Sequence, residues 1–234
     1  MNFDMKRFII LMIGCACFGV LAQAQGEEAL LKAVKAKLDK VQDYEARGRM
    51  TIDVPFIQAP QSDVIVYYKK PNLFKVKKSD GISILPKGGG GINMGSVLAS
   101  DEFTVVPAGR AVVAGINTNV IKLLPQSETG DIVLMTLYID EKAALIRRSK
   151  VTTRENGSYE IELAYGKYAA WGLPDNVVFS FNAKAYKLPK GITFEYEKSG
   201  QPAPAAPKDT NGKIAISYSS YSINKGISAA VFAK

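Results

Sequence analysis

The spacing of apolar residues changes once along this chain, from a helical period to an alternating one. Between Glu27 and about Val41, apolar residues recur every three or four positions and predict one amphipathic helix. From Ala46 to Val54, apolar and polar residues alternate, which is typical of a half-buried strand. Further alternating or short apolar segments predict strands at 64–68, 73–78, 120–124, 132–139, 145–153, 158–165, 177–181, 192–196 and 213–219.

One long helix and many short strands favour a mainly β (α+β) fold built on a single large curved antiparallel sheet, a barrel or half-barrel. The strands at 145–153 and 158–165 are separated by Glu155-Asn156-Gly157. Asn-Gly accepts positive φ at little cost, so this spacing predicts a hairpin. Large apolar residues on one face of many strands leave either a filled core or a cavity for an apolar ligand.

The absence of histidine from the 234 residues restricts the chemistry available to the chain. A chain without histidine cannot form a Ser-His-Asp or Cys-His catalytic site, nor the usual mixed zinc site. No aspartate series of the calcium-loop type is present either. We therefore predict no metal and no cofactor, and a binding protein in preference to an enzyme.

The first 24 residues have the pattern of a secretory signal peptide. Lys6 and Arg7 precede an apolar stretch, and Ala22-Gln23-Ala24 is a small-x-small cleavage pattern. Removal of 1–24 would leave an exported, periplasmic chain that begins at Gln25 and contains no cysteine. In an alternative interpretation, Met12-Ile13-Gly14-Cys15 is a lipobox, and the mature protein is anchored to a membrane through a lipidated Cys15.

The mature chain is expected to form one half-barrel domain at 25–200. The Gly-rich stretch at 86–100 is expected to be a mobile loop, because its lysine precedes the glycines and a phosphate-binding loop needs the reverse order. Residues 201–211 form a Pro/Ala-rich connector. Residues 212–234 are too few for a separate core and are predicted to add a strand to the same domain.

Two sets of charged residues have both a functional and a structural interpretation. Glu160 and Glu162 share one strand face, as the carboxylates of a glycosidase could, but nearby basic residues favour a solvated outer face. The chain has a net charge of +8, with one basic cluster at 69–78 and another at 147–150. These clusters suit anionic lipid headgroups or an acidic partner rather than nucleic acid, or they serve solubility alone.

Several segments of the chain match a known protein family in order and spacing. The segment 31–49 leads into Tyr67-Tyr68-Lys69-Lys70-Pro71-Asn72-Leu73-Phe74, and the Pro-Asn-Leu-Phe element is the most specific part of the match. The later segments are similar over roughly 28–196; they are Ile121–Pro125, Leu137–Asp140, Leu173–Asp175, Phe179–Phe181 and Leu188–Ile192. Together these segments resemble the LolA/LolB-like family of bacterial lipoprotein carriers.

The resemblance implies an unclosed β-barrel with helices as a lid over a hydrophobic cavity. In that family the cavity carries lipoprotein acyl chains from an inner-membrane releasing complex to an outer-membrane receptor, and we expect a monomer here. Lys70 stands where the family has an arginine that contacts the lid, and a lysine lacks the planar fork of arginine. The residues predicted to line the cavity are Met50, Ile52, Val66, Tyr68, Phe74, Leu137 and Ile139 on strands, with Val34 and Leu38 on the helix.

Three other functions remain open at this stage. The domain could be a filled structural or sensor domain of the cell envelope that binds a protein partner. It could be a membrane-anchored lipoprotein acceptor of the LolB type. It could also be a hydrolase that uses Glu160 and Glu162.

Overall fold

The structure, a computed structural model, describes residues 26–54, 57–58, 61–78, 94–100, 102–127, 130–155, 157–182 and 211–232. The predicted signal peptide and the predicted strand at 192–196 lie outside these residues. An N-terminal helix occupies 26–38. The elements that follow are β1 (Asp43–Val54), β2 (Ile57–Gln58), β3 (Ser62–Lys69), β4 (Leu73–Lys78), α2 (Met94–Ser100), β5 (Phe103–Val113), β6 (Ile116–Pro125), β7 (Ile132–Asp140), β8 (Leu145–Thr153), β9 (Ser158–Ala164), η2 (Ala169–Trp171), β10 (Asn176–Asn182), β11 (Asn211–Ile223) and η3 (Ala229–Phe232).

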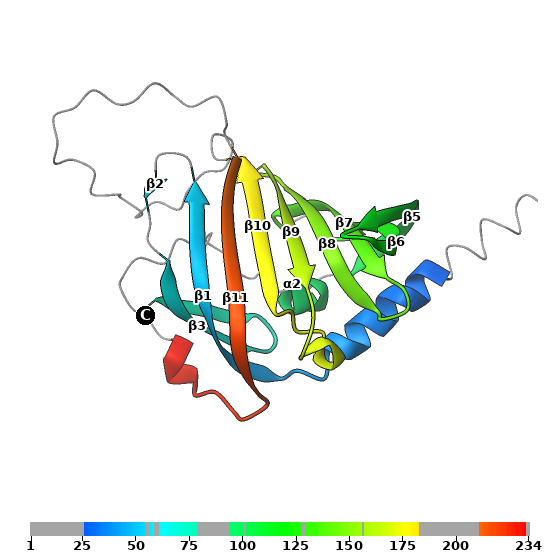
Figure 1. Cartoon of the computed structure of the whole chain (residues 1–234). Coiled ribbons are helices and arrows are strands. Elements are labelled where there is room, and N and C mark those ends of the chain that lie inside the picture. The colour runs from blue at the N-terminus through cyan, green and yellow to red at the C-terminus, as the bar shows by residue number, and fades with distance from the viewer. Residues whose placement is uncertain are drawn as a thin grey trace, which may run out of the picture.

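The strands form one antiparallel sheet in the order β4-β3-β1-β11-β10-β9-β8-β7-β6-β5, with β2 paired to the end of β1 (Figure 1). Strands β4 and β5 are the two ends of this path and do not pair with each other, so the sheet is unclosed. The N-terminal helix and α2 lie behind the sheet in Figure 1. The predicted fold class, a single curved antiparallel sheet covered by an amphipathic helix, is confirmed.

Alternation along the strands decides which side chains face the helices. In β1, Ala46, Met50 and Ile52 are buried, whereas the intervening Arg47 and Arg49 are exposed. The predicted hairpin is present between β8 and β9, where Thr152 pairs with Ser158. The apolar residues of the buried face form one continuous core together with Leu30, Leu31 and Val34 of the N-terminal helix.

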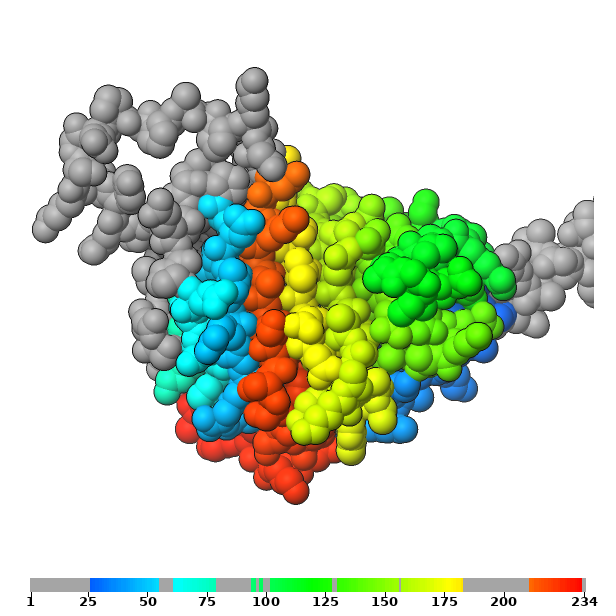
Figure 2. All heavy atoms as spheres, viewed as in Figure 1, coloured from blue at the N-terminus to red at the C-terminus, as the bar shows by residue number. Residues whose placement is uncertain are grey.

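Strand β11 occupies the middle of the sheet although it comes last in the chain. It pairs with β1 on one side and with β10 on the other. Figure 2 shows it as a continuous orange band between blue β1 and yellow β10. The C-terminal strand β11 therefore lies between β1 and β10 and pairs with both. The sequence resemblance ends near residue 196 and does not predict this position.

The prediction of a mobile loop at 86–100 was wrong for its last seven residues. Residues 94–100 form α2, and Met94, Val97 and Leu98 of this helix are buried in the core. A helix of seven residues, about two turns, presents few apolar positions, and the glycines before it do not indicate a helix. The rest of the Gly-rich stretch lies outside the described residues.

Strand β5 was not predicted either, because Pro107 and Gly109 interrupt its sequence. The register between β5 and β6 shifts between Pro107 and Arg110, and Gly109 has a φ of +85°. β5 is the last strand in the described part of the sheet, and an edge strand tolerates proline, which has no N–H to donate to a neighbouring strand. An irregular edge strand of this kind has no clear signal in the sequence.

Candidate functional site: the concave face of the sheet

The candidate site is the apolar face of the sheet that the N-terminal helix and α2 cover. The structure places all nine predicted lining residues on this face. Seven are buried members of the continuous core: Val34, Met50, Ile52, Val66, Tyr68, Leu137 and Ile139. Leu38 and Phe74 are partly buried and pack against the same core. The strand faces were therefore assigned correctly, and ligand binding by these residues stays a prediction.

The nine residues fall into two groups at different parts of the sheet. Val66 pairs with Val76 and Tyr68 pairs with Phe74, which brings β1, β3 and β4 together at one end. Leu137 lies on β7, five strands away from β1 along the sheet. The face between the two groups is made by residues that the prediction omitted: Val151, Ile161, Leu163, Val177, Phe179, Ile214 and Ile216. Their alternation was visible in the sequence, but the order of the strands that carry them was not.

The N-terminal helix packs closely on the end of the site near the β7–β8 turn. Beneath it, Val34 and Leu38 face Met94, Ile146 and Tyr165 across a gap of about 10 Å³. A void of this size holds at most about one water molecule. In this conformation the helix therefore fills the space that it covers, at least where the structure describes it.

Polar contacts fix the C-terminal end of the helix to the sheet. The Lys70 ammonium donates hydrogen bonds to Asp39 Oδ1 at 2.7 Å and to the Asp39 carbonyl at 3.1 Å. The Lys37 ammonium donates to the carbonyl of Ala143 in the β7–β8 turn. Cations are favoured at the carbonyl end of a helix. Lys70 thus contacts the element that the resemblance identifies as a lid.

The Lys70–Asp39 contact is a weak one. The Asp39 side chain keeps 63% of its surface exposed, and the Lys70 side chain keeps 25%. Ion pairs with such exposure stabilise proteins by about 1 kcal/mol or less. The contact can therefore open without a large change in free energy.

A cluster of tyrosines closes one end of the concave face. Tyr221 lies 4.8 Å from Tyr168, 5.1 Å from Tyr218 and 5.3 Å from Tyr44, measured between ring centroids. Tyr44 in turn lies 5.3 Å from Tyr68. The Tyr221 hydroxyl donates to the Pro174 carbonyl at 2.7 Å. Burial raises the pKa of Tyr221 and of Tyr218 well above the usual range, so both phenols stay neutral.

The carboxylates considered for a hydrolase form a surface ion-pair network. Glu160 lies 3.3 Å from Arg148 and 3.3 Å from Lys150, and Glu162 lies 2.5 Å from Arg148. Each carboxylate thus has a cationic partner beside it, as the interpretation as an outer face predicted. Among the described residues, no group of three or more Asp, Glu, Cys or His side chains could hold a metal ion. Within the same residues, no helix has the length and hydropathy needed to cross a membrane.

Comparisons with known proteins give structural neighbours rather than sequence relatives. The chain matches no family model and no curated protein. A DUF1329 family protein from Desulfovibrio piger superposes with a TM-score of 0.52 at 11% identity, over 88% of this chain and 96% of the other. That likeness and the unclosed sheet decide the fold.

The fold is an unclosed antiparallel barrel like that of the DUF1329 protein.

Two further neighbours of this open barrel have lower scores. A LolA superfamily protein from Nitrosomonas europaea has a TM-score of 0.49 at 7% identity, over 87% of this chain and 97% of that protein. A domain described as an outer membrane lipoprotein-sorting protein from Vibrio parahaemolyticus has a TM-score of 0.46 at 10% identity, over 86% and 95% of the two chains. At such identities a likeness describes the fold and leaves the ligand open.

Proposed function

We propose that the chain is an exported, non-enzymatic carrier that shelters the acyl chains of lipoproteins, or of other lipids, on the concave face of the open barrel. The observation that carries this proposal is the continuous apolar core on one face of a sheet whose edge strands do not meet. An open edge lets a cover move aside without breaking strand pairing. The resemblance to lipoprotein carriers supplies the class of ligand.

The free energy gained by burying an acyl chain on this face exceeds the free energy lost by displacing the N-terminal helix from it. Displacing the helix exposes Leu30, Leu31 and Val34, each at least 92% buried. Exposing each side chain costs about 1.5–3 kcal/mol, so the three together cost roughly 5–9 kcal/mol. An acyl chain of sixteen carbons gains about 0.8 kcal/mol per buried CH₂, or roughly 12 kcal/mol if it is fully covered. An acyl chain can therefore replace the helix on this surface.

Lys70 is the proposed lid contact of this exchange. Its ammonium bonds the end of the N-terminal helix, and the contact is partly exposed. Opening this contact removes one of the two polar contacts described at the carbonyl end of the helix, and the strands stay paired. The lysine ammonium is a single point charge, whereas an arginine guanidinium is planar and can donate two parallel hydrogen bonds. We therefore expect a weaker contact to the helix than in carriers with arginine.

The remaining features of the proposal come from the sequence. The signal peptide at 1–24 would direct the chain to the periplasm, where it would act as a soluble monomer between an inner-membrane releasing complex and an outer-membrane receptor. Lipidation of Cys15 would instead make it a tethered acceptor. The mass of the mature N-terminus separates the two forms, because one begins at Gln25 and the other at a diacylated Cys15.

The proposal is tested by acyl binding to the purified mature chain. Native mass spectrometry after mild purification should show bound lipid, and a fluorescent fatty acid should bind at a saturable site. Lys70→Ala should speed uptake of the probe about two- to tenfold, since it removes an exposed ion pair and a contact to a helix end. Lys40→Ala is the matched control, because Lys40 is an exposed lysine beside the same helix end.

One outcome would contradict the carrier, and another would contradict only the role of Lys70. A chain that is free of lipid and takes up no acyl probe would leave the sensor domain with a protein partner as the better description. Equal uptake rates in Lys70→Ala, Lys40→Ala and the wild type would remove Lys70 from the lid while leaving the carrier itself in place.

A further inference from the structure

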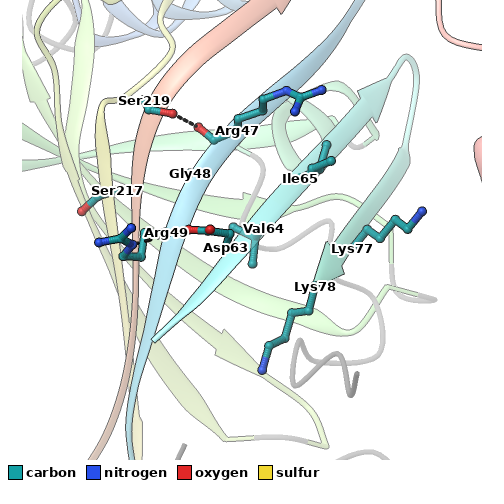
Figure 3. Close-up of a pocket in the computed structure, with 10 residues that line it drawn as sticks. All are labelled: Arg47, Gly48, Arg49, Asp63, Val64, Ile65, Lys77, Lys78, Ser217 and Ser219. Carbon is teal, nitrogen blue, oxygen red and sulfur yellow. Dashed lines mark hydrogen bonds and ion pairs between the residues drawn. The ribbon is translucent and has the colours of Figure 1, made fainter. Parts of the chain in front are cut away.

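The outer part of the sheet carries a groove that acyl binding on the concave face does not use. It has a volume of about 640 Å³ and crosses four neighbouring strands, β11, β1, β3 and β4 (Figure 3). Residues from all four strands line it, among them Arg47, Arg49, Asp63, Ile65, Lys77 and Lys78. A groove of this size is in the range of small-molecule sites.

The strand register places two cations on either side of an apolar residue. Arg47 of β1 pairs with Ile65 of β3, and Ile65 pairs with Lys77 of β4. Neighbouring strands lie about 4.8 Å apart, so the backbones at Arg47 and Lys77 are roughly 10 Å apart. Figure 3 shows Ile65 between these two side chains. Both side chains are long enough to converge on one group bound above Ile65.

The groove has an excess of positive charge. Four cationic side chains line it, against the single carboxylate of Asp63. Arg49 lies 3.4 Å from Asp63, and Arg47 lies 3.1 Å from Glu45 beside the groove, but both arginine side chains are 65% exposed. Ion pairs of such exposure are weak and readily exchanged for another anion. Lys77 and Lys78 form no ion pair with any described residue.

The second basic cluster of the sequence, at 147–150, differs from the groove because its cations have carboxylates beside them. Arg147 pairs with Asp140 at 2.7 Å, and Arg148 and Lys150 pair with the carboxylates of β9. That cluster is neutralised by its own neighbours. The groove keeps an excess of positive charge, to which the basic cluster at 69–78 contributes Lys77 and Lys78.

We propose that this groove binds the phosphate-bearing headgroup of an anionic phospholipid. Arginine and lysine on separate strands suit the charge and the several oxygens of a phosphodiester, and the exposed Ser217 beside Arg49 adds a hydroxyl donor. Ile65 gives the groove an apolar floor, which suits the glycerol and upper acyl carbons of a lipid better than a free inorganic ion. Arg47, Ile65 and Lys77 alternate with buried residues of their strands and so point away from the concave face, and the proposal does not depend on the carrier function.

Vesicle flotation of the mature chain tests this site. The chain should float with vesicles of phosphatidylcholine and phosphatidylglycerol, and not with phosphatidylcholine alone. Arg47→Gln combined with Lys77→Gln should weaken this binding at least about tenfold. The control combines Lys122→Gln with Lys142→Gln, which removes the same charge from exposed positions on β6 and the β7–β8 turn. It should change binding by less than about twofold.

A second pair of substitutions and a competitor complete the test. Arg47→Gln combined with Arg49→Gln, two outward-facing residues of β1, should reproduce the loss, and melting temperatures should show that both variants are folded. Acyl-probe uptake should be unchanged in both, which separates a failure of this site from a failure of the carrier proposal. Inorganic phosphate should not displace the vesicles at matched ionic strength.

Three results would overturn the assignment. The first is an absence of binding to anionic vesicles. The second is an equal loss in the groove variants and in the control, which would mean that net charge alone attracts the chain. The third is saturable binding of inorganic phosphate in the groove without vesicle binding, which would make a soluble phosphate compound the ligand.

Discussion

Leu137→Ala is the substitution that examines the concave face most directly. Leu137 is fully buried on β7, between Ile121 on β6 and Ser149 on β8. Truncating a fully buried leucine removes its transfer free energy and leaves a cavity, and costs about 3–4 kcal/mol. For a chain of this length each kcal/mol lowers the melting temperature by about 2–4 °C, so we expect a decrease of roughly 6–16 °C.

Leu124→Ala is the matched control for this prediction. Leu124 lies on the neighbouring strand β6 but keeps 43% of its surface exposed. Its truncation should lower the free energy of unfolding by less than about 1 kcal/mol. Urea unfolding followed by circular dichroism measures the free energy of unfolding of both variants. The dependence of this free energy on urea concentration should be the same in both. Equal losses in the two variants, or a larger loss for Leu124→Ala, would refute the assignment of strand faces.

The same variant also tests whether acyl chains reach this part of the face. If a bound acyl chain lies over Leu137, it fills part of the cavity that the truncation leaves. Saturating acyl probe should then stabilise Leu137→Ala more than it stabilises the wild type or Leu124→Ala. Equal stabilisation of all three by the probe would place the acyl chain elsewhere on the sheet.

Three further predictions concern single positions of the framework. Gly48→Ala should destabilise the chain by about 1–3 kcal/mol in urea unfolding, because an added Cβ would lie 2.5 Å from the Ser217 carbonyl oxygen; an unchanged midpoint would mean that the β-bulge relaxes freely. Burial raises the pKa of Asp140, but hydrogen bonds from Arg147 and the following turn outweigh it and hold that pKa below its ordinary value of 3.8. The stability that this carboxylate provides is therefore complete above about pH 4 and is lost as the pH falls further. The urea midpoint of Asp140→Asn should accordingly depend less on pH below 4 than the midpoint of the wild type. Parallel pH profiles of the two midpoints would contradict this. Asn224→Ala should lower the free energy of unfolding by about 1–3 kcal/mol and speed amide exchange in the segment after the N-terminal helix. The reason is that Asn224 combines a φ of +55° with side-chain hydrogen bonds to that segment. Unchanged amide exchange there would show that these hydrogen bonds do not stabilise the segment.

The candidate site could be predicted in part because burial follows local alternation. Met50 and Ile52 face the core since every second residue of a strand points to the same side, and Val34 does so since it lies on the apolar stripe of its helix. The middle of the site was missed for a different reason. Ile161 and Ile216 alternate equally well, but only strand order places them between β1 and β7.

The contacts that make the two proposals testable come from residues far apart in the chain. Lys70 bonds Asp39, which lies 31 positions earlier in the chain. The register of three strands places Arg47 and Lys77 on either side of Ile65. No spacing in the sequence relates these residues, because sheet register depends on the packing of all the strands together.

The sequence alone determined the helix, the strand segments with regular alternation and the side of each strand that is buried, because these follow from the periods of 3.6 and 2 residues and from the hydrophobic effect. The tertiary structure alone decided that the last strand lies in the middle of the sheet, that residues 94–100 form a helix on the core, and which basic side chains have a carboxylate beside them. Those features depend on pairing between segments distant in sequence, whose free energy is set by partners that no local pattern records.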